Sequence, residues 1–253
     1  MITAGLASVT FRGRTVEEVV DLAAGAGLGV VEWGADVHVP PGDPVGAARA
    51  ARLCRERGLT VGTYGSYYKA GDSEPADFDR ALAAAGALGA PRIRVWAGVR
   101  GSAETGPAER EAITDDLRRC ARLAAEGGVA VTVEHHVSSL TDTLDSALRL
   151  RRDVPGLVGH WQPREEPDVR ECLADVTALL PGLAAVHAFS WGADGFTERL
   201  PLADRADLWR PVLALLAGDG AERHVLLEFV QDDDPDAFRR DAATLLSWVG
   251  EVA

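Results

Sequence analysis

The sequence predicts a single-domain α/β protein whose parallel strands close into a (β/α)8 barrel. Short apolar runs alternate with amphipathic helical patterns along the whole chain. The length of 253 residues agrees with the ~250 residues that one such barrel takes. No linker, charge block or change in composition divides residues 1–253, so we expect one domain over that range. An open doubly wound sheet is the alternative architecture.

Eight apolar runs, rich in β-branched and aromatic residues, predict buried parallel strands. They are ITAGLASV (2–9), GVVEW (29–33), LTVGTY (59–64), RIRVW (92–96), VAVTVE (129–134), LVGHWQ (157–162), LAAVHAF (183–189) and HVLLEF (224–229). A helical pattern follows each run, and parallel strands need helical crossovers of this kind. Eight strand–helix units in succession favour the closed barrel.

The helical segments carry their own start and stop signals. Thr15 and Glu18 have the spacing of a capping box before the first helix, and Asp234 followed by Pro235 predicts the start of the last one. Glycines stand where four of the helices should end, at Gly27, Gly58, Gly89 and Gly127. Pro211 predicts that the seventh helix begins near it or bends there.

Charge and cysteine content narrow the function classes. Lys and Arg number 26 against 39 Asp and Glu, a net charge of −13, so a nucleic-acid backbone would be repelled on average. The three cysteines form no Cys-x-x-Cys pair and predict reduced, buried thiols. No apolar run reaches the ~18 residues of a membrane span, and the first residues lack the basic region of a secretory signal. We expect a cytoplasmic protein without a nucleic-acid or membrane partner; the oligomeric state is not indicated.

Polar and aromatic side chains close most of the predicted strands. In such a barrel, functional groups gather at the carboxyl ends of the strands. These ends carry Glu32, Tyr64, Trp96, Glu134, Gln162, His187 and Glu228. Charged groups are costly inside an apolar core unless they are paired, so four successive late strands ending in Glu, Gln, His and Glu predict a site. Arg94 shares the parity of Trp96, and an arginine inside the barrel would need Glu32 or Glu134 as its partner.

Several of these segments resemble one family. GVVEWGADVHV (29–39), IRVWAG (93–98), VTVEHH (131–136), HWQP (160–163), AVHAF (185–189), ERLPL (198–202) and LLEF (226–229) are similar to the xylose isomerase-like TIM barrels. That superfamily includes sugar-phosphate isomerases and epimerases, ketose 3-epimerases, hydroxypyruvate isomerases and inosose dehydratases, with endonuclease IV as a distant relative. One scaffold serves all of these reactions, so the resemblance says little about the substrate.

The resemblance implies a divalent metal held by a Glu, an Asp, a His and a Glu after the last four strands. Glu134, His187 and Glu228 occupy three of these positions, whereas Gln162 stands where the family has Asp. Glu165 stands where the family often has a histidine. Two carboxylates, an imidazole and an amide oxygen suit Mn²⁺ or Mg²⁺, with Zn²⁺ as the alternative.

Proton transfer beside a carbonyl needs an acid–base pair, for which Glu134 and Glu228 are the catalytic candidates, and a metal that stabilises the enediolate. The predicted function is therefore a metal-dependent isomerase or epimerase of a small sugar or hydroxy-ketone. The alternatives are a lyase, either inosose dehydratase-like or C-glycoside-cleaving, and a non-catalytic sugar-binding barrel that has lost its metal. The candidate substrate contacts are strand-end and loop residues: Glu32, His38, Tyr64, Trp96, His136, Trp161 and Trp191.

Overall fold

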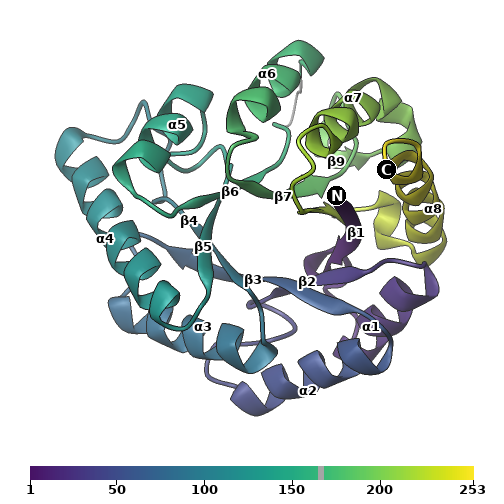
Figure 1. Cartoon of the computed structure of the whole chain (residues 1–253), viewed down its shortest axis with the longest axis horizontal. Helices are drawn as coiled ribbons and strands as arrows, with labels where there is room; N and C mark the ends of the chain where they lie inside the picture. Colours follow the sequence, from purple (N-terminus) through teal and green to yellow (C-terminus); the bar gives the residue numbers. More distant parts are fainter. Residues whose placement is uncertain (165–167) are drawn as a thin grey trace.

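Eight parallel strands form a closed barrel with helices around it (Figure 1). The computed structural model describes residues 1–164 and 168–253, and within them the strand order around the barrel is β1-β10-β7-β6-β5-β4-β3-β2. Because β1 pairs in parallel with both β10 and β2, the sheet has no open edge. The predicted (β/α)8 barrel is confirmed, and the open doubly wound sheet is excluded.

The strands lie where the apolar runs predicted them. Their bounds are β1 (Ile2–Ala7), β2 (Val30–Gly34), β3 (Thr60–Lys69), β4 (Arg92–Trp96), β5 (Ala130–Glu134), β6 (Val158–Trp161), β7 (Leu183–Ala188) and β10 (Arg223–Leu227). Only β3 departs clearly from its prediction, since it continues to Lys69. Its pairing with β4 is irregular between Gly65 and Lys69, and Tyr67 in this stretch has a φ of 57°.

The helices follow the strands in order, and the first and last begin at the predicted caps. They are α1 (Val16–Gly25), α2 (Pro44–Glu56), α3 (Pro75–Leu88), α4 (Pro107–Glu126), α5 (Leu144–Asp153), α6 (Val169–Leu179), α7 (Ala206–Ala217) and α8 (Pro235–Glu251). Thr15 and Glu18 form both bonds of a capping box, and the Asp234 carboxylate accepts from two amides of α8. Helix α7 already begins at Ala206, so it does not start at Pro211, which lies inside it.

A short hairpin interrupts the alternation between β7 and α7. Its strands, β8 (Trp191–Gly192) and β9 (Gly195–Arg199), pair antiparallel in a separate two-stranded sheet. Because it directly follows the carboxyl end of β7, the hairpin lies at the end of the barrel where the polar strand ends were predicted to meet (Figure 1). The sequence analysis did not predict this hairpin.

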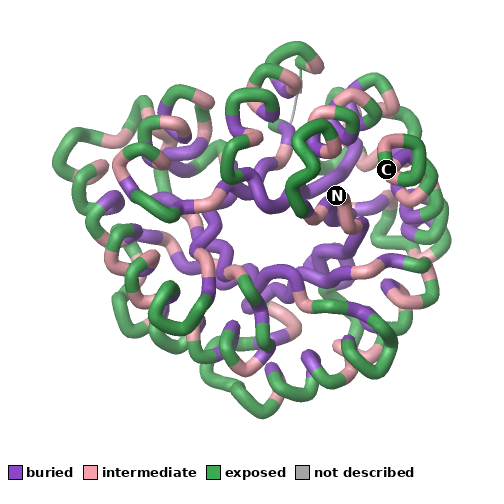
Figure 2. Tube along the Cα trace, in the orientation of Figure 1, coloured by how far each residue is buried: buried purple, intermediate pink, exposed green. Residues whose placement is uncertain are grey.

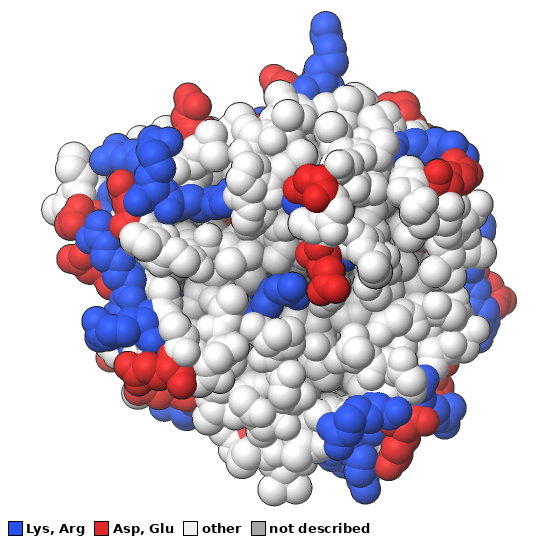
Figure 3. Space-filling view, in the orientation of Figure 1, with Lys and Arg blue, Asp and Glu red and all other residues white. Residues whose placement is uncertain are grey.

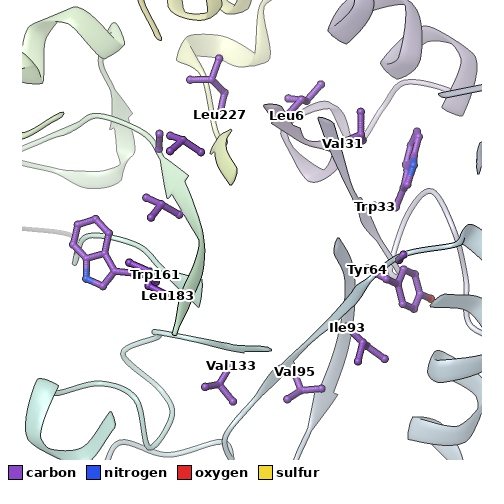
Figure 4. Packing of buried hydrophobic residues seen from close by; sticks show 14 of the residues in the cluster. Leu6, Val31, Trp33, Tyr64, Ile93, Val95, Val133, Trp161, Leu183 and Leu227 are labelled. Atoms are coloured by element: carbon purple, nitrogen blue, oxygen red, sulfur yellow. The ribbon is translucent and has the colours of Figure 1, made fainter. Parts of the chain in front are cut away.

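The main hydrophobic core lies between the barrel and its ring of helices. Figure 4 shows strand side chains such as Leu6, Val95 and Val133 pointing away from the barrel centre, toward the helices. Figure 2 shows the same division in the burial of the chain, with buried strands inside and exposed outer helix faces. Because side chains alternate along a strand, the neighbours of these core residues point into the barrel.

The surface and the cysteines agree with the sequence analysis. Cys54, Cys120 and Cys172 are free and buried. In Figure 3, charged side chains gather mainly over the helices around the rim, and a few stand at the centre of the face in view. None of the helices in the described ranges combines the length and the apolar character that crossing a membrane requires.

Candidate active site

A cluster of ionisable side chains fills the carboxyl end of the barrel interior. Glu32 is the last residue of β2 that pairs with β1, Arg94 lies on β4, Glu134 closes β5, and His187 lies on β7. Glu228 follows β10 directly and is, like the other four, no more than 4% exposed. Such a concentration of buried charge is unfavourable unless the groups compensate one another. These five buried ionisable side chains must therefore compensate one another's charge.

His187 is the centre of this cluster. Its Nδ1 lies 3.2 Å from Gln162 Oε1, 3.4 Å from Glu228 Oε2 and 3.5 Å from Glu134 Oε1. Its other ring nitrogen, Nε2, lies 3.1 Å from Glu32 Oε1. The residues that the resemblance implied as metal ligands thus meet around one imidazole nitrogen, and a fourth side chain holds the opposite side of the ring.

Arg94 ties two of the carboxylates together. Its Nη1 donates to Glu134 Oε2, and its Nε lies 3.2 Å from Glu32 Oε1. The indole Nε1 of Trp96 also donates to Glu134 Oε2, so that oxygen has two donors while Oε1 faces His187. The inward-pointing arginine predicted from its parity is present, and it pairs with both carboxylates named for it.

The environment separates the pKa values of the three glutamates. Burial raises the pKa of Glu32, but Arg94, His187 and His160 together outweigh it and lower that pKa to about 2. The pKa of Glu134 is also low, because the same three side chains together outweigh the effect of burial. Burial raises the pKa of Glu228 to about 7, and the negative charge of Glu134 adds to the effect.

Burial lowers the pKa of His187, but the surrounding carboxylates outweigh it and raise that pKa to about 10. With the three carboxylates ionised and both Arg94 and His187 charged, the cluster has a formal charge of −1, so a cation that replaced the imidazole proton would be held by net negative charge.

The donor set fits a divalent metal. Donor atoms that share an ion at bond lengths of about 2.1 Å lie about 3 Å apart when adjacent, close to the distances around His187 Nδ1. Glu228 Oε2 is buried and has no hydrogen-bond partner among the described residues. A bound cation would compensate the cost of burying this oxygen. The Glu32 carboxylate on the far side of the imidazole matches the usual partner of a metal-binding histidine.

A second group of donors lies deeper in the barrel. Ligand atoms of Glu32, His160 and His187 lie within 4.8 Å of one another, which makes this group a candidate metal site as well. Arg94 Nε, however, is only 3.2 Å from Glu32 Oε1, so a cation placed there would be repelled by the guanidinium. The set of Glu134, Gln162, His187 and Glu228 differs in that three of its members line the cavity at the open end of the barrel.

A cavity of about 290 Å³ opens above the cluster. Its floor is polar, with Arg94, Glu134, Gln162 and Glu228, and its remaining lining is aromatic: Tyr67, Trp96, His136, Trp191, Phe196 and Phe229. The aromatic residues stand on opposite sides, since Trp96 ends β4 and Phe229 follows β10, which lies across the barrel from β4. The Trp96 ring stacks on His136 with a centroid distance of 4.8 Å. Such walls suit the apolar faces of a small polyhydroxylated molecule.

Three predicted substrate contacts do not line this cavity. Tyr64 and Trp161 point away from the barrel centre into the helix-facing core (Figure 4). The Tyr64 hydroxyl donates to the carbonyl oxygen of Val39 at 2.8 Å, and Trp161 packs edge-on against Trp209. His38 contacts the Ser8 hydroxyl and the carbonyl oxygen of Arg14 and does not line the cavity.

Trp96, His136 and Trp191 do line the cavity, and Glu32 lies below its floor. Glu165, where the family often has a histidine, lies outside the described residues. The structure adds Tyr67, Phe196 and Phe229, which the sequence analysis did not name. Tyr67 and Phe229 have left-handed backbones, with φ of 57° and 51°, and bulky residues rarely adopt this conformation away from functional sites. In the sequence, only the position of Phe229 directly after Glu228 hinted at such a role.

Comparison with known proteins decides the family. Residues 20–247 match the family model described as xylose isomerase-like TIM barrel. The chain belongs to this family. A curated protein, the 3-dehydroshikimate dehydratase from Bacillus anthracis, is 38% identical to this chain over 63 residues. The matched residues make up 25% of this chain and 22% of the relative's length.

Several solved structures share the architecture over nearly the whole chain. A probable 3-DHS dehydratase from Bacillus anthracis superposes with a TM-score of 0.78 at 18% identity, covering 97% of this chain and 99% of that one. An L-ribulose 3-epimerase gives 0.73 at 16% identity, with coverage of 100% and 96%. A D-allulose 3-epimerase from Methylomonas sp. also gives 0.73 at 16%, covering 97% of each chain. At these identities the likeness establishes the fold, and the named neighbours include both epimerases and dehydratases.

Proposed function

We propose that this protein is a metal-dependent enzyme that moves a proton at a carbon next to the carbonyl of a small sugar or hydroxy-ketone. The reaction class is isomerisation or epimerisation. The observation that carries the proposal is the arrangement around His187 Nδ1, where oxygens of Gln162, Glu228 and Glu134 lie within 3.2–3.5 Å below an aromatic-walled cavity. The epimerases among the structural neighbours are consistent with it.

Glu134, Gln162, His187 and Glu228 would hold the metal. When bound, a divalent ion supplies Lewis acidity that stabilises the negative charge of an enediolate. Mn²⁺ or Mg²⁺ suits the mainly oxygen donors, and Zn²⁺ is the alternative. Gln162 provides a neutral oxygen where the resemblance implied a carboxylate, so we expect the ion to be held weakly.

The two metal-binding glutamates also have the geometry of an acid–base pair. Glu134 and Glu228 approach His187 from β5 and from the end of β10, so their carboxylates border the cavity from different directions. One of them can take a proton from the carbon beside the carbonyl, and the other can return it to the neighbouring carbon or to the opposite face. Arg94 and Trp96 restrict Glu134 through its Oε2, while Glu32 restricts the imidazole ring.

A lyase is the second candidate function. It is favoured by the comparisons, because both the sequence match and a structural neighbour carry the name of a dehydratase. Elimination of water begins with the same removal of a proton beside a carbonyl and differs only in the departure of a hydroxyl from the next carbon. The same side chains can serve both reactions, so the products distinguish them.

The experiment is proton exchange in D₂O. The Mn²⁺-loaded protein is incubated with a panel of neutral ketoses and cyclic hydroxy-ketones, and deuterium incorporation and products are followed by NMR. We expect deuterium at a carbon next to the carbonyl of at least one compound, and its loss with EDTA and in Glu134→Gln. An isomerised sugar supports the isomerase or epimerase, whereas an unsaturated product supports the lyase. No exchange with any compound would contradict both.

A further inference from the structure

The aromatic residues of the chain divide into two groups by their burial. The chain has six Trp, six Phe and three Tyr residues. All of them are buried except five, which are Tyr67, Trp96, Trp191, Phe196 and Phe229. The same five line the site cavity, so every large aromatic ring that keeps accessible surface stands at this one opening. Exposed apolar side chains that gather in one place mark a binding surface, whereas scattered ones do not.

The aromatic lining forms two walls. One, the β4 wall, lies on or directly after β3, β4 and β5 and consists of Tyr67, Trp96 and His136. The other, the hairpin wall, follows β7 and β10 and consists of Trp191, Phe196 and Phe229. In the closed strand order, β3 lies opposite β7 and β4 lies opposite β10, so the two walls face each other. No aromatic ring pair in the described ranges joins them, and the polar floor of the cavity lies below the space between them.

The hairpin wall is held together by contacts among its own rings. The Phe196 ring packs edge-on against Trp191 and Phe229, with centroid distances of 5.5 and 5.0 Å. The guanidinium of Arg199 lies 4.4 Å from the centroid of Phe196 and is paired with Asp233 Oδ1 at 2.5 Å. This support fixes the Phe196 ring although the residue is 41% exposed. The wall is therefore formed before a ligand binds.

The β4 wall is ordered in the same way. The Trp96 ring lies between its neighbours, with centroid distances of 4.8 Å to His136 and 5.6 Å to Tyr67. Each wall also contains one bulky residue with a left-handed backbone, Tyr67 in the β4 wall and Phe229 in the hairpin wall. Such backbones are strained and persist mainly where function requires the side chain in that position. Both walls thus present aromatic rings at a cost to the fold.

The walls offer few hydrogen-bonding groups to a ligand. Trp96 Nε1 already donates to Glu134, and Trp191 Nε1 is buried, so neither indole N–H is available. His136 Nδ1 accepts a main-chain amide at 3.3 Å. At most the Tyr67 hydroxyl and the other imidazole nitrogen remain. Aromatic rings can cover the faces of a sugar, but a ketose carries a hydroxyl on almost every carbon. Its hydroxyls beyond the polar floor would lose water and find few partners here.

The charges around the cavity do not favour an ionic group between the walls. Arg94 is the cation of the described lining, and it is paired with Glu32 and Glu134. Arg199, behind Phe196, is paired with Asp233. A phosphate or carboxylate group would therefore meet the lining carboxylates without a cation of its own.

We propose that the substrate carries an uncharged planar ring, such as an aryl group, that binds between the two walls while its hydroxy-ketone part lies over the metal-binding residues. This inference rests on the proposed function and narrows its substrate class to aryl-substituted sugars or hydroxy-ketones. Aromatic rings pack edge to face or offset at centroid separations of about 4.5–7 Å, which is the packing within each wall. Because Phe196 both lines the cavity and is 41% exposed, the ring can enter from solvent.

The test compares ligands that share one hydroxy-ketone group and differ in the substituent. Calorimetry on the Mn²⁺-loaded full chain measures the affinities of hydroxyacetone, 1-hydroxy-4-phenylbutan-2-one, its cyclohexyl counterpart and D-fructose. We expect the phenyl compound to bind at least about tenfold more tightly than hydroxyacetone and D-fructose, because its ring is buried between the walls. It should also bind about threefold more tightly than the cyclohexyl compound, since only a flat ring stacks on other rings.

Two variants of the hairpin wall connect this preference to the structure. Phe196→Ser removes the ring, and Phe196→Leu keeps an apolar side chain without a ring face. We expect the ratio of phenyl-compound to hydroxyacetone affinity to fall about tenfold in the first and about threefold in the second. Melting temperatures should stay near that of the wild type, because residue 196 is already partly exposed. Val45→Ser makes the same kind of change on α2, at a residue that is 78% exposed and outside the cavity lining, and should leave the ratio unchanged.

Three outcomes overturn the proposal: a phenyl compound that binds no better than hydroxyacetone or D-fructose, equal affinities of the phenyl and cyclohexyl compounds, or the wild-type ratio in Phe196→Ser. Tight binding and deuterium exchange of D-fructose without a preference for the phenyl compound would remove the aryl group and leave the proposed function standing. Preferential binding of the phenyl compound without deuterium exchange in any compound would support the role of the walls and contradict the proposed function itself.

Discussion

The barrel buries an arginine at each end, and the two have opposite surroundings. Arg223 begins β10 at the amino end, where its guanidinium donates to the carbonyl oxygens of Leu183, Leu216 and Leu180 at 2.8–3.1 Å and to Asp219 Oδ2 at 2.6 Å. Arg94 lies at the carboxyl end, where its partners are the carboxylates of two residues that also contact His187.

The two arginines show how a buried charge that stabilises the fold differs from one that belongs to a functional site. The Arg223 guanidinium donates to one carboxylate and three main-chain carbonyl oxygens. Its charge and its hydrogen bonds are therefore satisfied within the fold. Arg94 contacts two carboxylates, those of Glu32 and Glu134. Glu32 Oε2 and Glu228 Oε2 have no hydrogen-bond partner within the described ranges. An excess of buried negative charge with unpartnered atoms is what a site for a cation and a polar substrate requires.

The largest effect should come from removing acid–base function at the carboxyl end. Glu134→Gln and Glu228→Gln preserve shape but cannot accept a proton, so we expect turnover to fall by about 10²–10⁴-fold. Melting temperature and circular dichroism should stay near those of the wild type. The exposed Glu251→Gln is the control and should keep full activity. A variant that retained most of its rate would exclude that carboxylate from proton transfer.

At the amino end, the same kind of change should affect stability and leave the chemistry alone. Arg223→Met leaves three main-chain carbonyl oxygens without their donor, so we expect the free energy of unfolding to fall by about 3 kcal/mol. Denaturant unfolding measures this, beside kcat/KM at a temperature where the variant is folded. Arg210→Met, which breaks a half-exposed pair with Glu251, should cost at most about 1 kcal/mol. Equal losses in the two variants would refute the structural role of Arg223.

Glu32 should affect metal binding more than turnover, because its carboxylate contacts His187. Its carboxylate fixes the imidazole ring with Nδ1 toward the other oxygens, so Glu32→Gln should weaken Mn²⁺ binding about tenfold, as loss of such a partner usually does. The turnover number at saturating Mn²⁺ should change much less than in Glu134→Gln. Calorimetric titration and metal-dependent kinetics measure the two quantities. An unchanged Mn²⁺ affinity would mean that the imidazole ring needs no support from Glu32.

His224 at the amino end gives a smaller, pH-dependent effect on stability. Burial and the charge of Arg92, whose Nη1 lies 3.3 Å from His224 Nδ1, lower the pKa of His224 to about 4; Glu32 opposes the shift. The unfolded chain, with an ordinary His pKa near 6.5, therefore binds more protons between about pH 6.5 and 4. The free energy of unfolding should fall as the pH drops through that window, and His224→Gln should reduce the fall by about 2 kcal/mol. Parallel pH–stability curves for the two proteins would contradict this assignment.

Much of this architecture could be predicted from the sequence because periodic signals determine it. The run RIRVW at 92–96 became β4 with the same bounds, and the pairing of Arg94 followed from its parity with Trp96. The hairpin at 191–199 could not be predicted, since its short strands carry no apolar alternation.

The alternation of side chains along a strand also explains why two candidate substrate contacts do not line the site cavity. Tyr64 closes its apolar run and Trp161 is the second-last residue of another, yet each lies next to an inward-facing position and must point outward. For Trp161 the sequence contained the answer, because His160 and Gln162 share the opposite parity. For Tyr64 it did not, since the irregular pairing of β2 with β3 between Val31 and Glu32 shifts the register there. The aromatic residues Tyr67 and Phe229 depend on left-handed backbones that no sequence pattern announced.

We propose that Glu134, Gln162, His187 and Glu228 together hold one divalent ion at the carboxyl end of the barrel. Calorimetric titration of the metal-free chain with Mn²⁺ tests it, with Gln162→Asp and His187→Ala beside the wild type. An Asp adds a formal negative charge where Gln162 offers a neutral oxygen, and a hard dication gains from each anionic ligand.

We predict one weak site per wild-type chain, about tenfold tighter binding in Gln162→Asp and none in His187→Ala. Titration curves without saturation in both the wild type and Gln162→Asp, or a site that survives in His187→Ala with unchanged affinity, would contradict the account.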